Sequence, residues 1–573
     1  MVDLKAWLPI NKKELQLRKW DELDVIIISG DAYVDHPSFG HAIIGRLIEN
    51  QGYKVAILPQ PNWRDDLRDF KKLGKPRLFF GITSGAMDSM VNHYTAFKRL
   101  RSNDAYTAGD VSGFRPDYAV SVYSRIVKQL YPDSFVILGG VEASLRRFTH
   151  YDYWSNSLKP SILEDSNADL LVYGMGEKPL LDILNVFKSK QHPDIDEFYD
   201  IPQIAYLSSK YEKEGLHLYS HEKCIESKKA FADNFKIIET ESNKLTSTRL
   251  LQITANKTLV VNPPSASLSE KEFDAIYELP FTRLPHPTYS KRGEIPAFVM
   301  INCSINIHRG CFGGCSFCTI SAHQGKFIVN RSENSILKEI ETISKMPSFK
   351  GYISDLGGPS ANMYRMKGIN SALCNLCVRP SCIFPEKCKN LNFNHRPLIS
   401  LYEKAEKLPY IKKITIGSGI RYDMLLDKKK EKEYALHEYI NRLIRFHVSG
   451  RLKVAPEHTE DHILTTMRKP SFDNFLKFKK VFDNINNSFQ LNQQLIPYFI
   501  SSHPACRLQD MQNLHKKIRQ INYKLEQVQD FTPTPLTLSS VIFYTGIHPY
   551  TGENVFCETQ IDKKKQQNQY FFK

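Results

Sequence analysis

The chain has 573 residues, too many for one ordinary domain, and 42% of them are hydrophobic and 24% charged. This composition is typical of globular proteins with well-buried cores. The net charge of +15 favours acidic partners such as nucleic acid, without locating a binding face. The N-terminus lacks the features of a secretory signal, and no run reaches the roughly 18 apolar residues of a transmembrane helix. We therefore expect a cytoplasmic protein with no membrane partner.

Residues 1–190 alternate short apolar runs with helical stretches. Continuous apolar strands separated by helices predict an α/β domain with a doubly wound, Rossmann-like parallel sheet. Glycines follow several of these strands, where such sheets bind ligands, but none completes the G-x-G-x-x-G pattern, so dinucleotide binding is not supported. The expected strands are 25–30, 54–58, 77–81, 135–140 and 170–174, and the first helix between them is expected over 42–51.

Composition divides the rest of the chain into three parts. Residues 191–295 are polar and mixed, and we expect them to connect two domains. The β/α alternation returns over 296–545, which predicts a full or partial (β/α) barrel. Residues 546–573 form a C-terminal tail, which we expect to be disordered from Lys563 to its last aromatic residues. The expected barrel strands are 298–305, 351–355, 413–417, 451–455 and 494–499.

The cysteines carry the strongest chemical signal. Seven of the eleven lie between Cys311 and Cys388, whereas the first 223 residues contain none. A tight group inside a long chain indicates metal ligation rather than a disulfide framework. Cys311, Cys315 and Cys318 form C-x3-C-x2-C among glycines, and three thiolates would leave one iron of a [4Fe-4S] cluster open to a small molecule. The alternatives are a zinc site completed by a nearby histidine and cysteines packed in a core.

This loop, with an aromatic residue just before its last cysteine, resembles the signature loop of the radical S-adenosylmethionine (SAM) superfamily. The resemblance extends over nearly the whole chain and is closest to the YgiQ-type radical SAM proteins. The segments that carry it are 304–315, 323–326, 331–332, 355–359, 417–423 and 453–458 in the barrel, with 277–283 and 531–535 outside it.

The resemblance implies a radical SAM barrel in which Cys311, Cys315 and Cys318 hold a [4Fe-4S] cluster that binds SAM. One electron, from a donor such as flavodoxin or ferredoxin, would cleave SAM to methionine and a 5′-deoxyadenosyl radical. The family's Gly-Gly-Glu-like segment falls at Gly357-Gly358, but Pro359 replaces the acidic residue. Backbone carbonyls or Asp355 would then bind the SAM amino group, unless this segment is only a turn.

Later strand ends offer further candidates. Ser418 and Arg421 follow one strand and are expected to face the SAM carboxylate. Glu457 and His458 end the next strand, where the catalytic residues of barrels gather. Each of these four side chains is about equally well explained by a structural role.

A second cysteine group lies in an insertion at 370–392. Cys374, Cys377, Cys382 and Cys388 form C-x2-C-x4-C-x5-C. Four cysteines can close a site around zinc or around a second iron–sulfur cluster, and spacing does not choose between the two. Thiols without a metal are the remaining alternative.

The N-terminal domain resembles the cobalamin-binding domains that precede many radical SAM barrels. The cobalt-ligating form uses D-x-H-x-x-G, whereas here His36 directly follows Asp35 and Gly40 lies four residues after it. The motif is not satisfied, so cobalamin is not favoured, although a cobalamin bound without a histidine ligand stays open.

Two functional hypotheses follow. The first is a radical SAM enzyme that acts on an unidentified substrate, with RNA as one candidate because of the basic charge and because relatives modify tRNA. The second is a non-catalytic iron–sulfur or zinc protein that binds nucleic acid or a protein partner. The open iron of a three-cysteine loop favours the enzyme.

Overall fold

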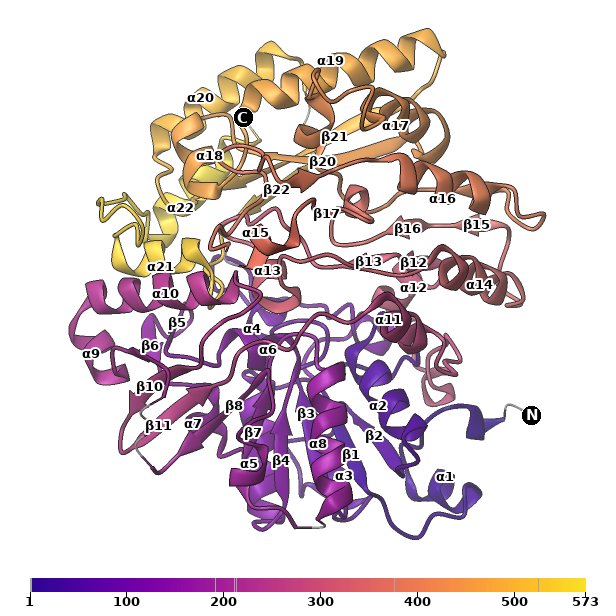
Figure 1. Ribbon diagram of the computed structural model, residues 1–573, viewed down its shortest axis with the longest axis vertical. Helices are drawn as coiled ribbons and strands as arrows, with labels where there is room; N and C mark the ends of the chain where they lie inside the picture. Colours follow the sequence, from indigo (N-terminus) through magenta and orange to yellow (C-terminus); the bar gives the residue numbers. More distant parts are fainter. Residues whose placement is uncertain are drawn as a thin grey trace.

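The computed structural model describes residues 3–190, 192–210, 212, 214–375, 377–523 and 525–572. The chain forms two α/β bodies, with the large sheet of the N-terminal half at the bottom of Figure 1 and the strands of the C-terminal half above it. Within the described ranges, no helix is both long and apolar enough to cross a membrane.

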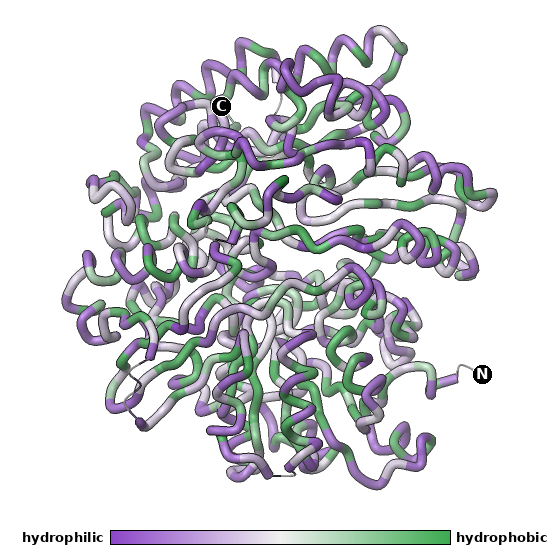
Figure 2. Tube along the Cα trace, viewed as in Figure 1, coloured by the Kyte–Doolittle hydropathy of each residue, from purple (hydrophilic) through white to green (hydrophobic). Residues whose placement is uncertain are grey.

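The N-terminal sheet begins with five parallel strands in the order β2-β1-β3-β4-β7. Successive residues of β1 enter different cores: Ile27 packs on one face of the sheet, and Ile26 and Ile28 pack on the other. Both faces are buried, which is why the strands are apolar throughout, as their colour in Figure 2 shows. The predicted doubly wound sheet is confirmed. Its strands are β1 (Val25–Ser29), β2 (Val55–Pro59), β3 (Phe79–Thr83), β4 (Phe135–Leu138) and β7 (Leu170–Val172).

The same sheet continues into the segment that we predicted to be a connection. Four further strands extend it in the order β8-β11-β10-β9, with antiparallel pairing from β7 to β10. Residues 191–295 therefore add an edge to the first sheet as well as joining it to the second body. The domain boundary at 190 stays a prediction. These strands are β8 (Ile204–Ser208), β9 (Leu216–Leu218), β10 (Leu250–Thr254) and β11 (Lys257–Val261).

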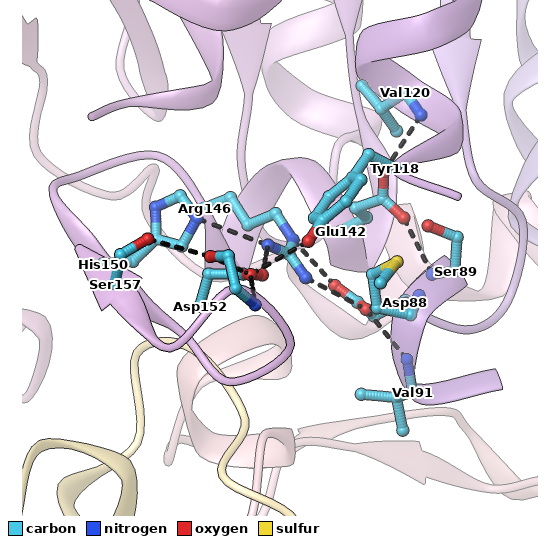
Figure 3. Close-up of polar contacts among 12 residues, drawn as sticks. Asp88, Ser89, Val91, Tyr118, Val120, Glu142, Arg146, His150, Asp152 and Ser157 are labelled. Atoms are coloured by element: carbon cyan, nitrogen blue, oxygen red, sulfur yellow. Dashed lines mark hydrogen bonds and ion pairs between the residues drawn. The ribbon is translucent and has the colours of Figure 1, made fainter. Parts of the chain in front are cut away.

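A buried ionic network fixes helix α6 (Gly140–Leu145), which follows β4 (Figure 3). Arg146 donates from Nε to Asp88 at 3.0 Å and from Nη1 to Asp152 at 3.3 Å. Glu142 accepts two backbone N–H groups, at 2.8 and 3.0 Å. Because each buried charge has partners, the network is a structural support, and it fixes α6 within the first body.

The second body is a partial barrel of short parallel strands. Three hydrogen-bonded groups form it: β12 with β16, β15 with β19, and β20 with β21 and β22. Helices such as α14 (Glu333–Ser344) and α19 (Phe472–Ser488) cover its outer face. The strands are β12 (Ser304–Asn306), β15 (Tyr352–Ile353), β16 (Asp355–Gly357), β19 (Lys413–Ile414), β20 (Arg451–Glu457), β21 (Gln494–Ser501) and β22 (Gln527–Asp530).

Two expectations need correction. The strand expected at 298–305 begins as helix α12 (Pro296–Ile301), and only β12 is extended. Pro296 occupies the first helical turn, where its fixed φ favours a helix and its missing N–H costs nothing. Short apolar runs do not separate strand from helix.

The tail expected to be disordered contains helix α22 (Ile561–Gln569). Lys564 is completely buried, and its ammonium donates to Phe531 O and to the Tyr153 hydroxyl, both at 3.1 Å. Phe571 joins the barrel core. The polar composition of the tail does not predict these few anchoring contacts, which order it.

Candidate active site

The three-cysteine loop connects strand β13 (His308–Arg309) to helix α13 (Ile320–Gln324). A Cβ atom on Gly313 would lie 2.9 Å from Nη1 of Arg421, so glycine allows the guanidinium to approach the loop closely. The same nitrogen lies 3.5 Å from Cys315 Sγ. The structure therefore brings Arg421, a predicted SAM-binding residue, to the cysteines.

The three thiols lie close enough to influence one another, and all three are partly exposed. Burial, with repulsion from Cys315 and Cys311, raises the pKa of the Cys318 thiol to about 12. Burial also raises the pKa of Cys311, where Cys315 adds to the effect and the charges of Arg421 and Lys469 oppose it. A thiol that coordinates a metal loses its proton. The positive charges of Arg421 and Lys469 would stabilise the resulting thiolates, so the site suits a metal cluster.

In the part of the chain that the structure describes, no three His, Cys, Asp or Glu side chains are close enough to hold a single metal ion. A [4Fe-4S] cluster does not need its cysteines to converge on one metal ion, because each thiolate binds a separate iron. The mutually interacting thiols of Cys311, Cys315 and Cys318 fit such a cube.

Two charged residues that the sequence analysis did not single out complete the surroundings. Asp423 accepts two hydrogen bonds from Arg421, at 2.9 and 2.8 Å, which leaves Nη1 of Arg421 directed at Cys315. The ammonium of Lys469, only 6% exposed, lies 3.4 Å from Glu457 Oε1. No spacing rule links residue 469 to the cysteines; only the fold does.

The predicted catalytic pair is split. Glu457 ends β20 with a φ of +68°, where the pairing with β21 is irregular, and its carboxylate lies beside Lys469. His458 turns elsewhere: Nδ1 accepts the Glu460 N–H at 3.1 Å, and Nε2 lies 3.7 Å from Cys506 Sγ. The positive φ of Glu457 ends the extended conformation at this point, and the side chains of Glu457 and His458 take different partners. The structure thus brings Glu457 toward the cluster loop, but not His458.

The segment expected to bind SAM is built on β16. Asp355 accepts the Gly417 N–H at 2.9 Å, the Ser418 N–H at 3.1 Å and the Ser418 hydroxyl. Both oxygens of this carboxylate therefore hold the next loop in place. A Cβ atom on Gly357 would lie 2.9 Å from Ser418 Oγ, so these two predicted SAM-binding residues are in direct contact.

A cavity of about 580 Å³ lies between the two bodies, and we refer to it as the interdomain chamber. Strands β1, β3, β4 and β7 line one side, at the point where the strand order reverses between β1 and β3 and where doubly wound sheets bind ligands. Residues 308–309, helix α13 and Gly358-Pro359 line the other side. The chamber therefore shares a wall with the cluster loop.

Polar contacts close the chamber across the domain interface. His323 of α13 lies 3.1 Å from the Ser144 hydroxyl of α6, measured from Nδ1. Arg309 forms a buried ion pair with Glu177, the first residue of helix α8 (Glu177–Ser189). Both pairs join the first sheet directly to the segments that flank the three cysteines.

Several buried polar atoms at the chamber wall have no hydrogen-bond partner of normal geometry among the residues that the structure describes. They are Nε2 of His41, the second carboxylate oxygen of Glu177 and both ring nitrogens of His308. Leaving such atoms unpaired costs about 1–3 kcal/mol each, so their gathering around one cavity is typical of a binding site. Sequence patterns did not identify His41 or Glu177.

The histidine of the incomplete cobalamin motif does not face the chamber. His36 Nε2 lies 2.8 Å from Nη2 of Arg283, and Nδ1 accepts the Ser38 N–H. Asp35 is paired with Arg46. His36 is therefore committed to the domain interface.

The four-cysteine group lies on the surface beside the loop. Burial raises the pKa of Cys382 to about 11, where Lys326 opposes the rise and the other three thiols add to it. The four thiols thus lie close enough to influence one another's ionisation, and all four are partly exposed. Cys374 lies within the short helix α15 (Ser371–Asn375).

Comparison with known proteins identifies the class. The family profile described as Radical SAM N-terminal matches residues 7–304, more than half of the chain. Together with the partial barrel and its three-cysteine loop, this match defines a radical SAM enzyme, a class that uses a [4Fe-4S] cluster, SAM and a reductant.

The chain belongs to the UPF0313 family, the YgiQ-type radical SAM proteins. It is 57% identical to a UPF0313 protein of Bacteroides thetaiotaomicron over 99% of this chain and 94% of that protein. A UPF0313 protein of Porphyromonas gingivalis is 55% identical over 99% of this chain and 90% of that protein. The predicted family is confirmed.

Two solved structures are similar at low identity. OxsB, a cobalamin-dependent SAM radical enzyme solved with aqua-cobalamin, matches with a TM-score of 0.50 and 11% identity, over 91% of this chain and 55% of OxsB. The methyltransferase TsrM from Kitasatospora setae matches with a TM-score of 0.48 and 12% identity, over 90% of this chain and 77% of TsrM. The likeness to OxsB shows a shared fold.

Proposed function

We propose that this enzyme cleaves SAM at a [4Fe-4S] cluster held by Cys311, Cys315 and Cys318, and that the substrate binds in the interdomain chamber. The observation that carries the proposal is the shared wall: α13, which starts two residues after Cys318, and Gly358 both line the chamber. A substrate there would lie next to the place where SAM is held.

In this proposal, the bound cluster and SAM supply the electron and the radical chemistry. Arg421 and Lys469 offset the negative charge of the thiolates. The Gly357-Gly358 backbone and Ser418 border the SAM, and Asp355 holds that loop in position. Of the two residues predicted to be catalytic, we propose only Glu457 as a catalytic residue, because its carboxylate lies on the cluster side of the barrel.

The test is an anaerobic assay of the reconstituted protein with SAM and dithionite that measures 5′-deoxyadenosine. We expect the wild type to form it and Cys315→Ala to form none. Cys557→Ala is the matched control, because this cysteine lies outside both groups. A wild-type protein that carries a reducible cluster but never cleaves SAM would leave the non-catalytic alternative as the better reading.

The chamber's walls also narrow the choice of substrate. A cavity of about 580 Å³ admits a small molecule or a single base extruded from a strand, but not a duplex. RNA remains a prediction that rests on the net charge and on relatives that modify tRNA. Binding of RNA at low salt, where phosphate contacts are strongest, would support it, and its absence would remove it.

Cobalamin is the other candidate for the chamber. The strand order and the chamber's place at its reversal favour it, as does the fold shared with OxsB. Because His36 is held by Arg283, the corrinoid would bind without that ligand, or with His41 after a side-chain movement. Titration with hydroxocobalamin, followed by its absorption spectrum in wild type and His41→Ala, separates these cases; no spectral change would exclude the corrinoid.

A further inference from the structure

The segment that contains the four cysteines exposes an unusual amount of apolar surface. Ile369, Leu373 and Val378 are 66%, 62% and 48% exposed, within ten residues of chain. These three side chains form what we refer to as the apolar patch. Apolar groups gathered at a metal-binding segment and left open to solvent are typical of a contact surface for a partner protein.

The surroundings of the patch are basic. Residues 365–390 contain five basic side chains and one acidic one. Lys367 and Lys389 are exposed, and neither forms an ion pair with the part of the chain that the structure describes. An apolar centre with a positive rim complements an acidic protein, and such charges steer the encounter more than they tighten it.

Nitrogen donors lie near two of the four sulfur atoms of the group. The buried ammonium of Lys326 lies 3.7 Å from Cys377 Sγ, and the side-chain amide of Asn390 lies 3.4 Å from Cys374 Sγ. The Cys388 N–H donates to Cys382 O at 2.8 Å, which closes the segment on itself. Hydrogen bonds and positive charge at the sulfur atoms offset the negative charge of a thiolate-bound iron–sulfur cluster.

The segment presses directly on the three-cysteine loop. The Cys382 N–H donates at 3.0 Å to the carbonyl of Phe312, the residue after Cys311. Gly314 has a φ of +61°, and a Cβ atom there would lie 2.3 Å from Pro380 O. Cys382 of the outer group is therefore linked to Cys311 of the inner group through one hydrogen bond and the residue Phe312.

We propose that the four cysteines hold a second iron–sulfur cluster that passes electrons inward from a small acidic carrier docked on the apolar patch. The proposal rests on the proposed function, because the inner cluster is the acceptor. A carrier of the flavodoxin or ferredoxin type loses one electron, the outer cluster gains it and then gives it to the inner cluster. No bond forms or breaks at the protein, and no proton is required at the cysteines.

Metal content tests the cluster. The anaerobically reconstituted wild type should hold about eight irons per chain and give two reduced cluster signals by electron paramagnetic resonance. The Cys374→Ser/Cys377→Ser variant should hold about four irons and give one signal, whereas Cys557→Ser should match the wild type. Stoichiometric zinc with about four irons in the wild type would overturn the proposal.

Docking is tested with reduced flavodoxin as the probe. We expect Leu373→Glu/Val378→Glu to lower the rate of cluster reduction by flavodoxin at least tenfold relative to the rate with dithionite. Met300→Glu is the matched control, because Met300 is 67% exposed but lies on α12, outside the patch. An unchanged ratio in the patch variant, or an equal fall in the control, would overturn the docking site.

These readouts separate the two proposals. Two cluster signals without any 5′-deoxyadenosine from dithionite and SAM would refute the proposed function and leave the outer cluster standing. 5′-Deoxyadenosine from a protein with about four irons and zinc would do the reverse.

Discussion

The two cysteine groups differ in how the fold surrounds them. The three-cysteine loop is covered by the first domain and lies beside two buried cations, Arg421 and Lys469. The four-cysteine segment carries Leu373 and Val378, which are 62% and 48% exposed. A site that makes reactive radicals benefits from exclusion of water, whereas a site that meets a protein partner must be reachable.

The difference also shows how one chain can separate two tasks that conflict. Shielding the inner cluster removes it from direct contact with an electron donor. In our proposal, a second cluster on the four cysteines, joined to the inner loop through Phe312 and Pro380, restores that contact without opening the site. The predictions below test this division, beginning with the largest expected effect.

Arg421→Met should destabilise the enclosed site most. Asp423 would be left buried without its partner, and removing one member of a buried ion pair costs about 3–5 kcal/mol of unfolding free energy. Chemical denaturation of the anaerobic protein measures this loss. The double variant Arg421→Met/Asp423→Leu should recover most of it, because no charge is then stranded. Equal losses in the single and double variants would show that the pair itself matters little.

The enclosed site should also be sensitive to acid. Burial lowers the pKa of His308 to about 3, below its ordinary value of 6.5, so the unfolded chain takes up the proton first as the pH falls. The unfolding free energy should therefore fall from pH 6.5 toward pH 3, by up to about 4 kcal/mol from this residue. His308→Gln should flatten the profile, whereas the exposed His437→Gln should not. Parallel profiles for wild type and His308→Gln would contradict this reading.

Gly314→Ala should separate the two cysteine groups. The new Cβ would clash with the Pro380 carbonyl, and the alanine would have to adopt a positive φ. Together these effects should lower the unfolding free energy by about 2–3 kcal/mol. Gly552→Ala supplies the control, because Gly552 has a φ of +74° and nothing within 4 Å of its Cβ position. Only the Gly314 variant should slow reduction by flavodoxin. The same slowing in both variants would break the proposed contact.

Iron removal should distinguish the groups by rate. A ferrous-iron chelator added to the reduced protein should strip the outer cluster several-fold faster than the inner one, because the outer segment is exposed. Loss of the two cluster signals, followed over time by electron paramagnetic resonance, measures both rates. Saturating SAM should slow only the inner loss, since binding at the open iron protects it. Simultaneous loss of both signals would contradict the proposed difference in accessibility between the two cysteine groups.

The sequence predicted the sheet well, because strands buried on both faces, such as 25–30 and 135–140, are apolar along their whole length. It failed where few contacts decide the structure. Residues 298–301 are apolar in either a strand or a helix, and the tail is ordered by Lys564 and Phe571. Such anchoring contacts reach partners far away in sequence, and local composition does not record them.

The sequence alone indicated the radical SAM class, since C-x3-C-x2-C and its flanking motifs are local and resemble those of that superfamily. The tertiary structure decided which remote residues join them. It brought Arg421 and Lys469 to the thiols, turned His458 away, and set the chamber between the bodies. Spacing fixes a short loop, but burial, pairing and cavity shape depend on chain segments that meet only when the protein folds.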